Sequence, residues 1–274
     1  MVTSAVTVQD IIPIVLQRPN AKKVDPDTVL PYVLVPVLLL VSTLSFIITC
    51  IVMVAIVMGA LYVYSRPRQK NRSPFFYSWT KSSIIYMWIL FEVEVRGFLE
   101  ITAMEHAIFL ALLACTIYYF YRMKAVSDFE LATGSSKGKE YSLVITGDCH
   151  YCPICQLEVK DRYFHSIWWD CCVIQQNYVY FLSGMLVAFV TILYGVNLGL
   201  TTICHSFLFM GNVLIPTDCS DAYSDFHRAF AFVGCIYGMG YLGVILLVLL
   251  KQIFSHVPHY AGLKLKKFKT ALTV

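Results

Sequence analysis

The sequence predicts an all-α, polytopic membrane protein of about six transmembrane helices with a short cysteine-rich cytosolic loop. The chain has 274 residues, of which 58% are hydrophobic and only 14% charged. So few polar side chains cannot cover the surface of a soluble globule, and the apolar residues gather in long charge-free runs. The net charge of +4 is too small to suggest a nucleic-acid partner. We therefore expect the lipid bilayer to be the main surface that this chain meets.

The first apolar run, residues 30–64, is too long for one simple crossing. A straight helix of that length would reach about 50 Å, against roughly 30 Å of hydrocarbon. Pro31, Pro36 and the polar residues 42–45 make a break possible, so we expect a hairpin of two short spans, with one strongly tilted span as the alternative. Together with this hairpin, four further spans are expected at 74–91, 101–121, 177–204 and 229–250.

Charged residues indicate how these spans are oriented, because short cytosolic loops retain Lys and Arg. Basic residues dominate 66–72 and the tail 251–274, whereas acidic residues dominate 92–105 and 205–228. The segment 1–29 is charged and shows no signal-peptide pattern. We therefore expect both termini to be cytosolic. The loop 122–176 is expected in the cytosol and the loop 205–228 in the lumen.

Two further patterns concern how the spans pack and how the lumenal loop is closed. Gly195 with Gly199 and Gly234 with Gly238 each have a small-x3-small spacing, which is typical of close helix packing within one chain or against a partner's span. Cys204 and Cys219 border the expected lumenal loop, where an oxidising compartment would allow a disulfide between them.

The loop 122–176 holds half of the ten cysteines, and their spacing suggests a metal site. Cys152-Pro153-Ile154-Cys155 has the two-residue gap of a structural zinc half-site. His165 and either Cys171 or Cys172 could supply the other two ligands, while free cytosolic thiols are the alternative. We expect Cys152, Cys155, His165 and Cys172 to hold one structural zinc ion, because a metal supplies folding energy that a short loop lacks.

The same residues, followed by Asn177 and Phe181 at the start of a span, resemble the end of the cysteine-rich domain of DHHC-type protein S-acyltransferases (palmitoyltransferases). Some members of that family have four spans before this domain and two after it. However, the Asp-His-His-Cys tetrad of the family has no counterpart between Ser166 and Asn177. The resemblance therefore implies a related frame without its catalytic cysteine, and no catalytic residue is expected.

A similar loss of the tetrad marks the DHHC-related pilot protein of a Golgi N-acetylgalactosaminyltransferase. This resemblance implies a non-catalytic scaffold, escort or pilot that binds another membrane protein, with a Golgi glycosyltransferase as the partner class. It also implies a membrane of the secretory pathway, with the Golgi favoured over the endoplasmic reticulum.

Two other functions stay open. An active protein S-palmitoyltransferase could use Cys171 or Cys172 as the nucleophile with His165 nearby, although paired cysteines beside a span are more often acceptors of palmitate. A small membrane transporter could use the Glu105-His106 pair. The chain shows no internal repeat and no charge within the two clearest spans, which disfavours transport.

Overall fold

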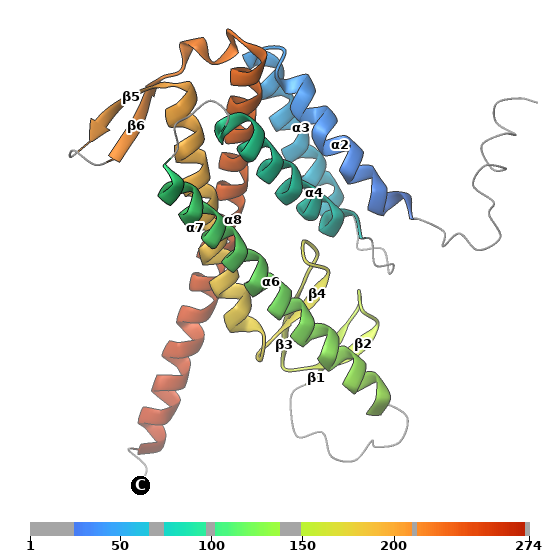
Figure 1. Cartoon of the computed structure of the whole chain (residues 1–274). Coiled ribbons are helices and arrows are strands. Elements are labelled where there is room, and N and C mark those ends of the chain that lie inside the picture. The colour runs from blue at the N-terminus through green and yellow to red at the C-terminus, as the bar shows by residue number, and fades with distance from the viewer. Residues whose placement is uncertain (1–24, 66–73, 97–101, 138–148, 210–212, 272–274) are drawn as a thin grey trace, which may run out of the picture.

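The fold is a bundle of helices with three small β-hairpins at its ends (Figure 1). This computed structural model describes residues 25–65, 74–96, 102–137, 149–209 and 213–271. The helices are α2 (Pro26–Ser42), α3 (Phe46–Ser65), α4 (Phe75–Leu90) continued by the π-helix η1 (Phe91–Val95), α6 (Ala103–Lys137), α7 (Tyr178–Ile203) and α8 (Phe226–Ala271). The antiparallel hairpins pair β1 (Cys149–Cys152) with β2 (Leu157–Lys160), β3 (Arg162–Ser166) with β4 (Cys171–Ile174), and β5 (His205–Phe209) with β6 (Val213–Asp218); a 3₁₀ turn, η2 (Ser220–Tyr223), precedes α8.

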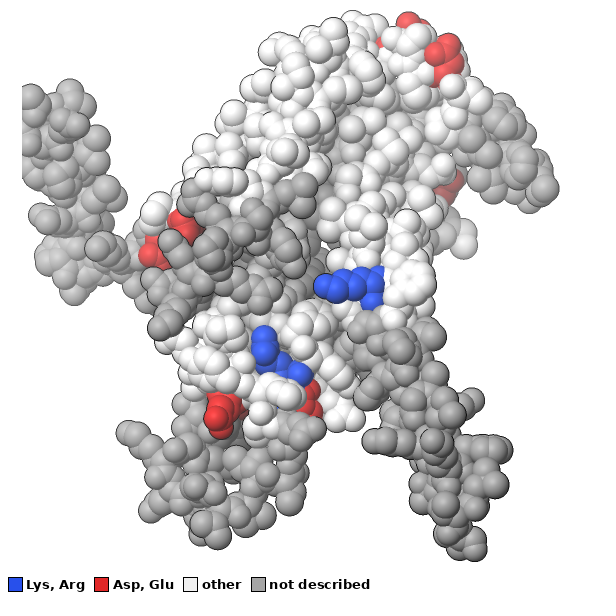
Figure 2. All heavy atoms as spheres, turned by 180° about the vertical axis from the view of Figure 1, so that it is seen from behind, with Lys and Arg blue, Asp and Glu red and all other residues white. Residues whose placement is uncertain are grey.

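The expected helical membrane fold is confirmed. Three helical stretches are long and apolar enough to cross a bilayer, Ala103–Ala132, Tyr178–Ile203 and Phe226–Phe254, and Pro26–Ser42 and Phe46–Gly59 are shorter apolar helices. Large apolar side chains lie on the outside of these helices, as a lipid environment requires. In Figure 2 the charged atoms form a few small groups, and a broad band of the bundle carries none. The count of six spans stays a prediction.

Successive helices run in alternate directions between two ends of the bundle. At the end that carries the disulfide, which we call the disulfide end, Thr49 Oγ1 of α3 lies 2.6 Å from the Tyr223 hydroxyl of η2, and Glu94 of η1 bonds His227 of α8 at 2.9 Å. At the other end, which we call the module end, the Phe76 ring of α4 packs against the Trp168 ring beside β4, with ring centroids 4.9 Å apart. The two ends thus lie at opposite sides of the helices (Figure 1).

The long run 30–64 breaks between α2 and α3, at its hydroxyl residues rather than at its prolines. Pro31 and Pro36 both lie inside α2. After Ser42, the Thr43 hydroxyl donates to the Leu40 carbonyl at 2.7 Å, and the Ser45 hydroxyl accepts from the Ile48 amide at 3.3 Å. These side chains replace the backbone partners that a helix loses at its ends, so the chain turns sharply and forms a helical hairpin.

Several boundaries differ from those expected from hydropathy. The span expected at 101–121 belongs to a helix that continues to Lys137, into the region assigned to the loop 122–176. The span expected at 74–91 continues as a π-helix to Val95, and the last helix runs from Phe226 to Ala271, through most of the basic tail. Hydropathy ends where charges begin, whereas a helix continues until its backbone hydrogen bonds are interrupted. The loop 205–228 contains β5, β6 and η2 rather than irregular chain.

Both small-x3-small pairs are used for packing inside this chain. A Cβ atom added at Gly199 would lie 2.6 Å from the Cys235 sulfur of α8, and one at Gly195 would lie 2.9 Å from the Phe109 ring of α6. At Gly234 and Gly238 it would lie 2.8 Å from Leu90 and Val196, respectively. The glycines therefore allow α7 and α8 to approach each other and their neighbours closely.

This packing predicts that Gly238→Val destabilises the bundle, because the new side chain overlaps the buried and β-branched Val196. We expect a loss of about 1–3 kcal/mol in the free energy of unfolding, measured by denaturant titration in detergent. The matched control is Gly240→Val in the same helix, where an added Cβ meets no atom within 4 Å. Equal losses in the two variants would contradict close packing at Gly238.

Candidate metal centre

Two β-hairpins at the module end bring together the side chains of the expected metal site. Cys152 ends β1, Cys155 lies in the turn that follows, His165 lies on β3 and Cys172 on β4. The register of the second hairpin places His165 directly opposite Cys172, so both side chains project from the same face. The four ligand atoms lie within 4.8 Å of one another.

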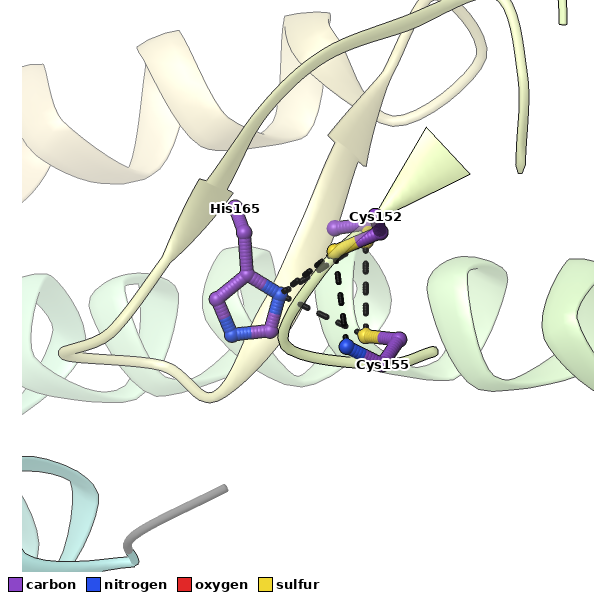
Figure 3. A group of neighbouring side chains, drawn as sticks. Cys152, Cys155 and His165 are labelled. Carbon is purple, nitrogen blue, oxygen red and sulfur yellow. Dashed lines mark hydrogen bonds between the residues drawn. The ribbon is translucent and has the colours of Figure 1, made fainter. Parts of the chain in front are cut away.

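The distances agree with a tetrahedral metal site. His165 Nδ1 lies 3.4 Å from the Cys155 sulfur, 3.6 Å from that of Cys172 and 3.8 Å from that of Cys152, and the Cys155 and Cys172 sulfurs are 3.5 Å apart. Ligands around one zinc ion, at its usual bond lengths, would be separated by about 3.6–3.8 Å. Figure 3 shows the imidazole of His165 turned toward Cys152 and Cys155. These four residues could hold a zinc ion.

The turn between Cys152 and Cys155 is shaped to present both sulfurs. The Cys155 amide donates to the Cys152 sulfur at 3.5 Å and the Gln156 amide donates to the Cys152 carbonyl at 2.8 Å. Gln156 has φ 57°, in the left-handed region, which closes the turn tightly. An amide that donates to a sulfur stabilises the thiolate, the form that binds a metal.

The alternation of the strand decides which of the adjacent cysteines joins the cluster. Neighbouring side chains on a strand point to opposite faces. Cys172 therefore faces the other ligands, whereas Cys171 is fully buried on the opposite face, in an apolar cluster with Phe120, Met123 and Phe181. Burial raises the pKa of the Cys171 thiol to about 12, so this sulfur is a poor nucleophile at neutral pH.

The cluster thiols titrate together. The hydrogen bond between the Cys172 and Cys155 sulfurs lowers the pKa of Cys155 to about 4. Burial acts in the opposite direction, and His165 adds to the lowering. The same hydrogen bond, with burial, raises the pKa of Cys172. A metal ion bound to these sulfurs would favour their thiolate forms.

The Asp170 carboxylate faces the Nε2 side of the His165 ring. It is 3.8 Å from His165 Nε2, on the side of the ring opposite the sulfurs, and the His165 side chain is only 2% exposed. At 3.8 Å the carboxylate acts on the ring through its charge rather than through a hydrogen bond, and that charge favours the tautomer with a proton on Nε2. The Asp170 carbonyl also accepts from Lys124 of α6 at 3.2 Å. Sequence spacing gave no indication of this contact, because its partners are 46 residues apart.

The module is fastened to the bundle by buried polar groups. The Asn177 amide donates to the carbonyls of Met123 and Cys172 at 3.1 and 3.0 Å, and its oxygen accepts from the Ile174 amide at 2.8 Å. Asn177 is completely buried. The Cys172 amide donates to the Ser127 hydroxyl of α6 at 3.1 Å. Every hydrogen-bonding group of the Asn177 side chain is thus engaged, which fixes β4 against α6 and α7.

The other expected sites have different outcomes. Cys204 and Cys219 form a disulfide that closes the β5–β6 loop. Cys171 and Cys172 are both fully buried, and their roles as lipidation sites or as a nucleophile stay predictions. The Glu105-His106 pair considered for transport is divided, since the His106 ring bonds Glu92 at 2.8 Å and Glu105 accepts from Thr102 at the start of α6.

This Cys₃His module between membrane helices is a feature of the DHHC-type enzymes, and comparisons with known proteins agree. The DHHC palmitoyltransferase family profile matches residues 135–265. Palmitoyltransferase ZDHHC23 of Homo sapiens is 25% identical over 300 residues, covering 84% of this chain and 71% of its own length. Palmitoyltransferase ZDHHC23-B of Danio rerio is 23% identical over 294 residues, covering 86% of this chain and 67% of its own. The chain is thus similar to DHHC palmitoyltransferases over its cysteine-rich module and the last two long helices.

The geometry predicts one zinc ion per purified chain, measured by inductively coupled plasma mass spectrometry. Cys155→Ser should reduce zinc to less than half of the wild-type amount, because it removes one of four ligands. Cys149→Ser is the control, since Cys149 is a neighbouring half-buried cysteine outside the cluster. Zinc that survives in Cys155→Ser, or is lost in Cys149→Ser, would contradict the assignment of ligands.

Proposed function

We propose that this chain is a non-catalytic DHHC-related membrane protein that serves as a scaffold, escort or pilot for a partner membrane enzyme. We propose a Golgi glycosyltransferase as the partner class, on the strength of the resemblance to a DHHC-related pilot protein. In this proposal the cysteine-rich module is a structural unit held by zinc rather than an acyl-transfer site.

The observation that carries the proposal is that the two cysteines considered as nucleophiles, Cys171 and Cys172, are both fully buried, and Cys172 lies within the Cys/His cluster. Cys152, Cys155 and Cys172 converge with His165, and Cys171 is buried among apolar side chains. Acyl transfer through a cysteine requires an accessible thiolate with a base in reach. Among the described residues, no histidine is hydrogen-bonded to Cys171, and the sequence has no Asp-His-His-Cys tetrad.

The zinc would have a supporting role in this proposal. Bound to the four residues, it would supply the cross-link that two short hairpins cannot obtain from an apolar core. His165 would bind through Nδ1 and keep its proton on Nε2 toward Asp170. Asn177 and Ser127 would then hold the cross-linked module against α6, where it offers a rigid surface to a partner.

The proposed orientation places the module end and both termini in the cytosol. Two observations on cysteine chemistry support it. The module end carries a cluster of free thiols, whereas the opposite end carries the Cys204–Cys219 disulfide. Disulfides persist in the oxidising lumen of the secretory pathway, and free thiols persist in the cytosol.

The second candidate is an active protein S-palmitoyltransferase. The names of the relatives favour it, because ZDHHC23 of Homo sapiens is called a palmitoyltransferase. This activity would require Cys171, or Cys172 released from the candidate metal cluster, to move to the surface.

Labelling with a click-reactive palmitate analogue distinguishes the two. We expect no hydroxylamine-sensitive label on this chain above the level of Cys171→Ala, because the Cys171 sulfur is inaccessible. ZDHHC23 of Homo sapiens, expressed in parallel, is the comparison for a named palmitoyltransferase. A thioester label that turns over, passes to another protein and disappears in Cys171→Ala would refute the non-catalytic proposal.

The partner role is tested by proximity labelling in cells, with the labelling enzyme fused after residue 274. Enrichment of a Golgi glycosyltransferase, retained when Cys171 is replaced by alanine, is the expected result. Labelling of Golgi membrane proteins with no glycosyltransferase enriched would contradict the proposed partner class.

A further inference from the structure

Lys81 is a cation in an otherwise uncharged helix. It lies in the second turn of α4, Phe75–Leu90, and its side chain is exposed on the outside of the bundle. Among the described residues, no carboxylate forms an ion pair with it. An ammonium group on the lipid-facing side of a helix is unfavourable unless it reaches the interface or an anion, so such residues usually have a function.

The Lys81 side chain extends toward the module end of α4. Its Nζ lies 4.5 Å from the centroid of the Tyr77 ring, which is one turn closer to the start of the helix. Helical side chains lean toward the N-terminus, and a lysine near a helix end directs its ammonium group to the water interface in this way. This direction would bring the ammonium group toward the level of the lipid headgroups.

The ammonium group of Lys124 also lies over the Tyr77 ring. Lys124 of α6 places its Nζ 5.2 Å from the Tyr77 centroid. Lys124 also donates to the Asp170 carbonyl and lies 3.8 Å from the Asp128 carboxylate, which is half exposed. Asp128 offsets the charge of Lys124 and the Asp170 carboxylate lies beside His165, so the positive charge that remains next to the Tyr77 ring is that of Lys81.

We propose that Lys81, Tyr77 and Lys124 bind the phosphate of an anionic lipid headgroup at the module end. The lipid-facing exposure of Lys81, its reach toward the interface and the excess positive charge all fit this ligand. Anionic lipids are concentrated in cytosolic leaflets, so the choice of phosphatidylserine as the probe rests on the orientation proposed above.

A headgroup in this position would brace three parts of the molecule. Lys81 belongs to α4, Lys124 belongs to α6, and Lys124 also holds the Asp170 carbonyl beside the metal centre. Headgroup binding would favour the position in which Lys124 contacts both Tyr77 and Asp170. The bound lipid would thereby help to join the first helices to the cysteine-rich module.

The test is a phosphatidylserine titration of the full purified chain, read by native mass spectrometry as the fraction of chains that retain the lipid. We expect Lys81→Gln to weaken retention about fivefold, the effect of losing one cation near an anionic lipid. Lys251→Gln removes another exposed lysine at the same end of the bundle, close to the Tyr178–Gln252 contact, and should retain the lipid like the wild type. Equal retention in Lys81→Gln and Lys251→Gln would overturn the proposal.

Two further arms separate this site from its alternatives. Lys81→Arg preserves the charge and should bind like the wild type, so a loss in that variant as large as in Lys81→Gln would also overturn the proposal. Inorganic phosphate at the concentration of the lipid should not displace phosphatidylserine; if it does, the site takes a soluble phosphate instead of a lipid. None of these readouts depends on acyl transfer or on a protein partner, so the site can fail while the proposed function stands.

Discussion

The convergence of Cys152, Cys155, His165 and Cys172 is the constraint on which the module depends. The two hairpins between α6 and α7 have strands of only four or five residues. Isolated two-stranded hairpins of this length are barely stable in water. Four ligands drawn from three places in the loop could be joined by one metal ion, and that cross-link would reinforce the small apolar cluster around Val159 and Ile174.

The metal centre is tied to the membrane helices through its neighbours. Asn177 fastens the last strand to α6 with its buried amide, and the Trp169 ring stacks on Phe120 of α6 with centroids 3.8 Å apart. Because ligand positions and helix positions share these contacts, a change in one is transmitted to the other. A module built in this way is suited to hold a fixed surface, and it buries the thiols of Cys171 and Cys172.

The part of this site that could be predicted from sequence is the part encoded by spacing. The two-residue gap between Cys152 and Cys155, and the later His165, predicted three of the four residues whose ligand atoms converge in the structure. Spacing alone allowed either Cys171 or Cys172 as the fourth ligand. The strand register, which pairs His165 with Cys172, distinguishes the two cysteines. The contacts of Ser127 and Lys124 could not be anticipated, because they depend on how α6 docks against the hairpin.

For the fold, hydropathy located the spans but not the ends of the helices. The break near Ser42 was visible as a group of hydroxyl residues, and the glycine pairs of α7 and α8 indicated close packing. The extension of α6 to Lys137 was missed because charged residues were taken to end a span, although they do not end a helix. The short strands were missed because four residues carry too little periodicity to distinguish a strand from a loop.

X-ray absorption at the zinc edge of the purified chain tests the central claim most directly, because it reports the atoms that surround the metal. The predicted shell has three sulfur atoms at about 2.3 Å and one nitrogen at about 2.0–2.1 Å. A shell dominated by oxygen or nitrogen, or one with four sulfur atoms, would contradict the assignment of Cys152, Cys155, His165 and Cys172 as the ligands.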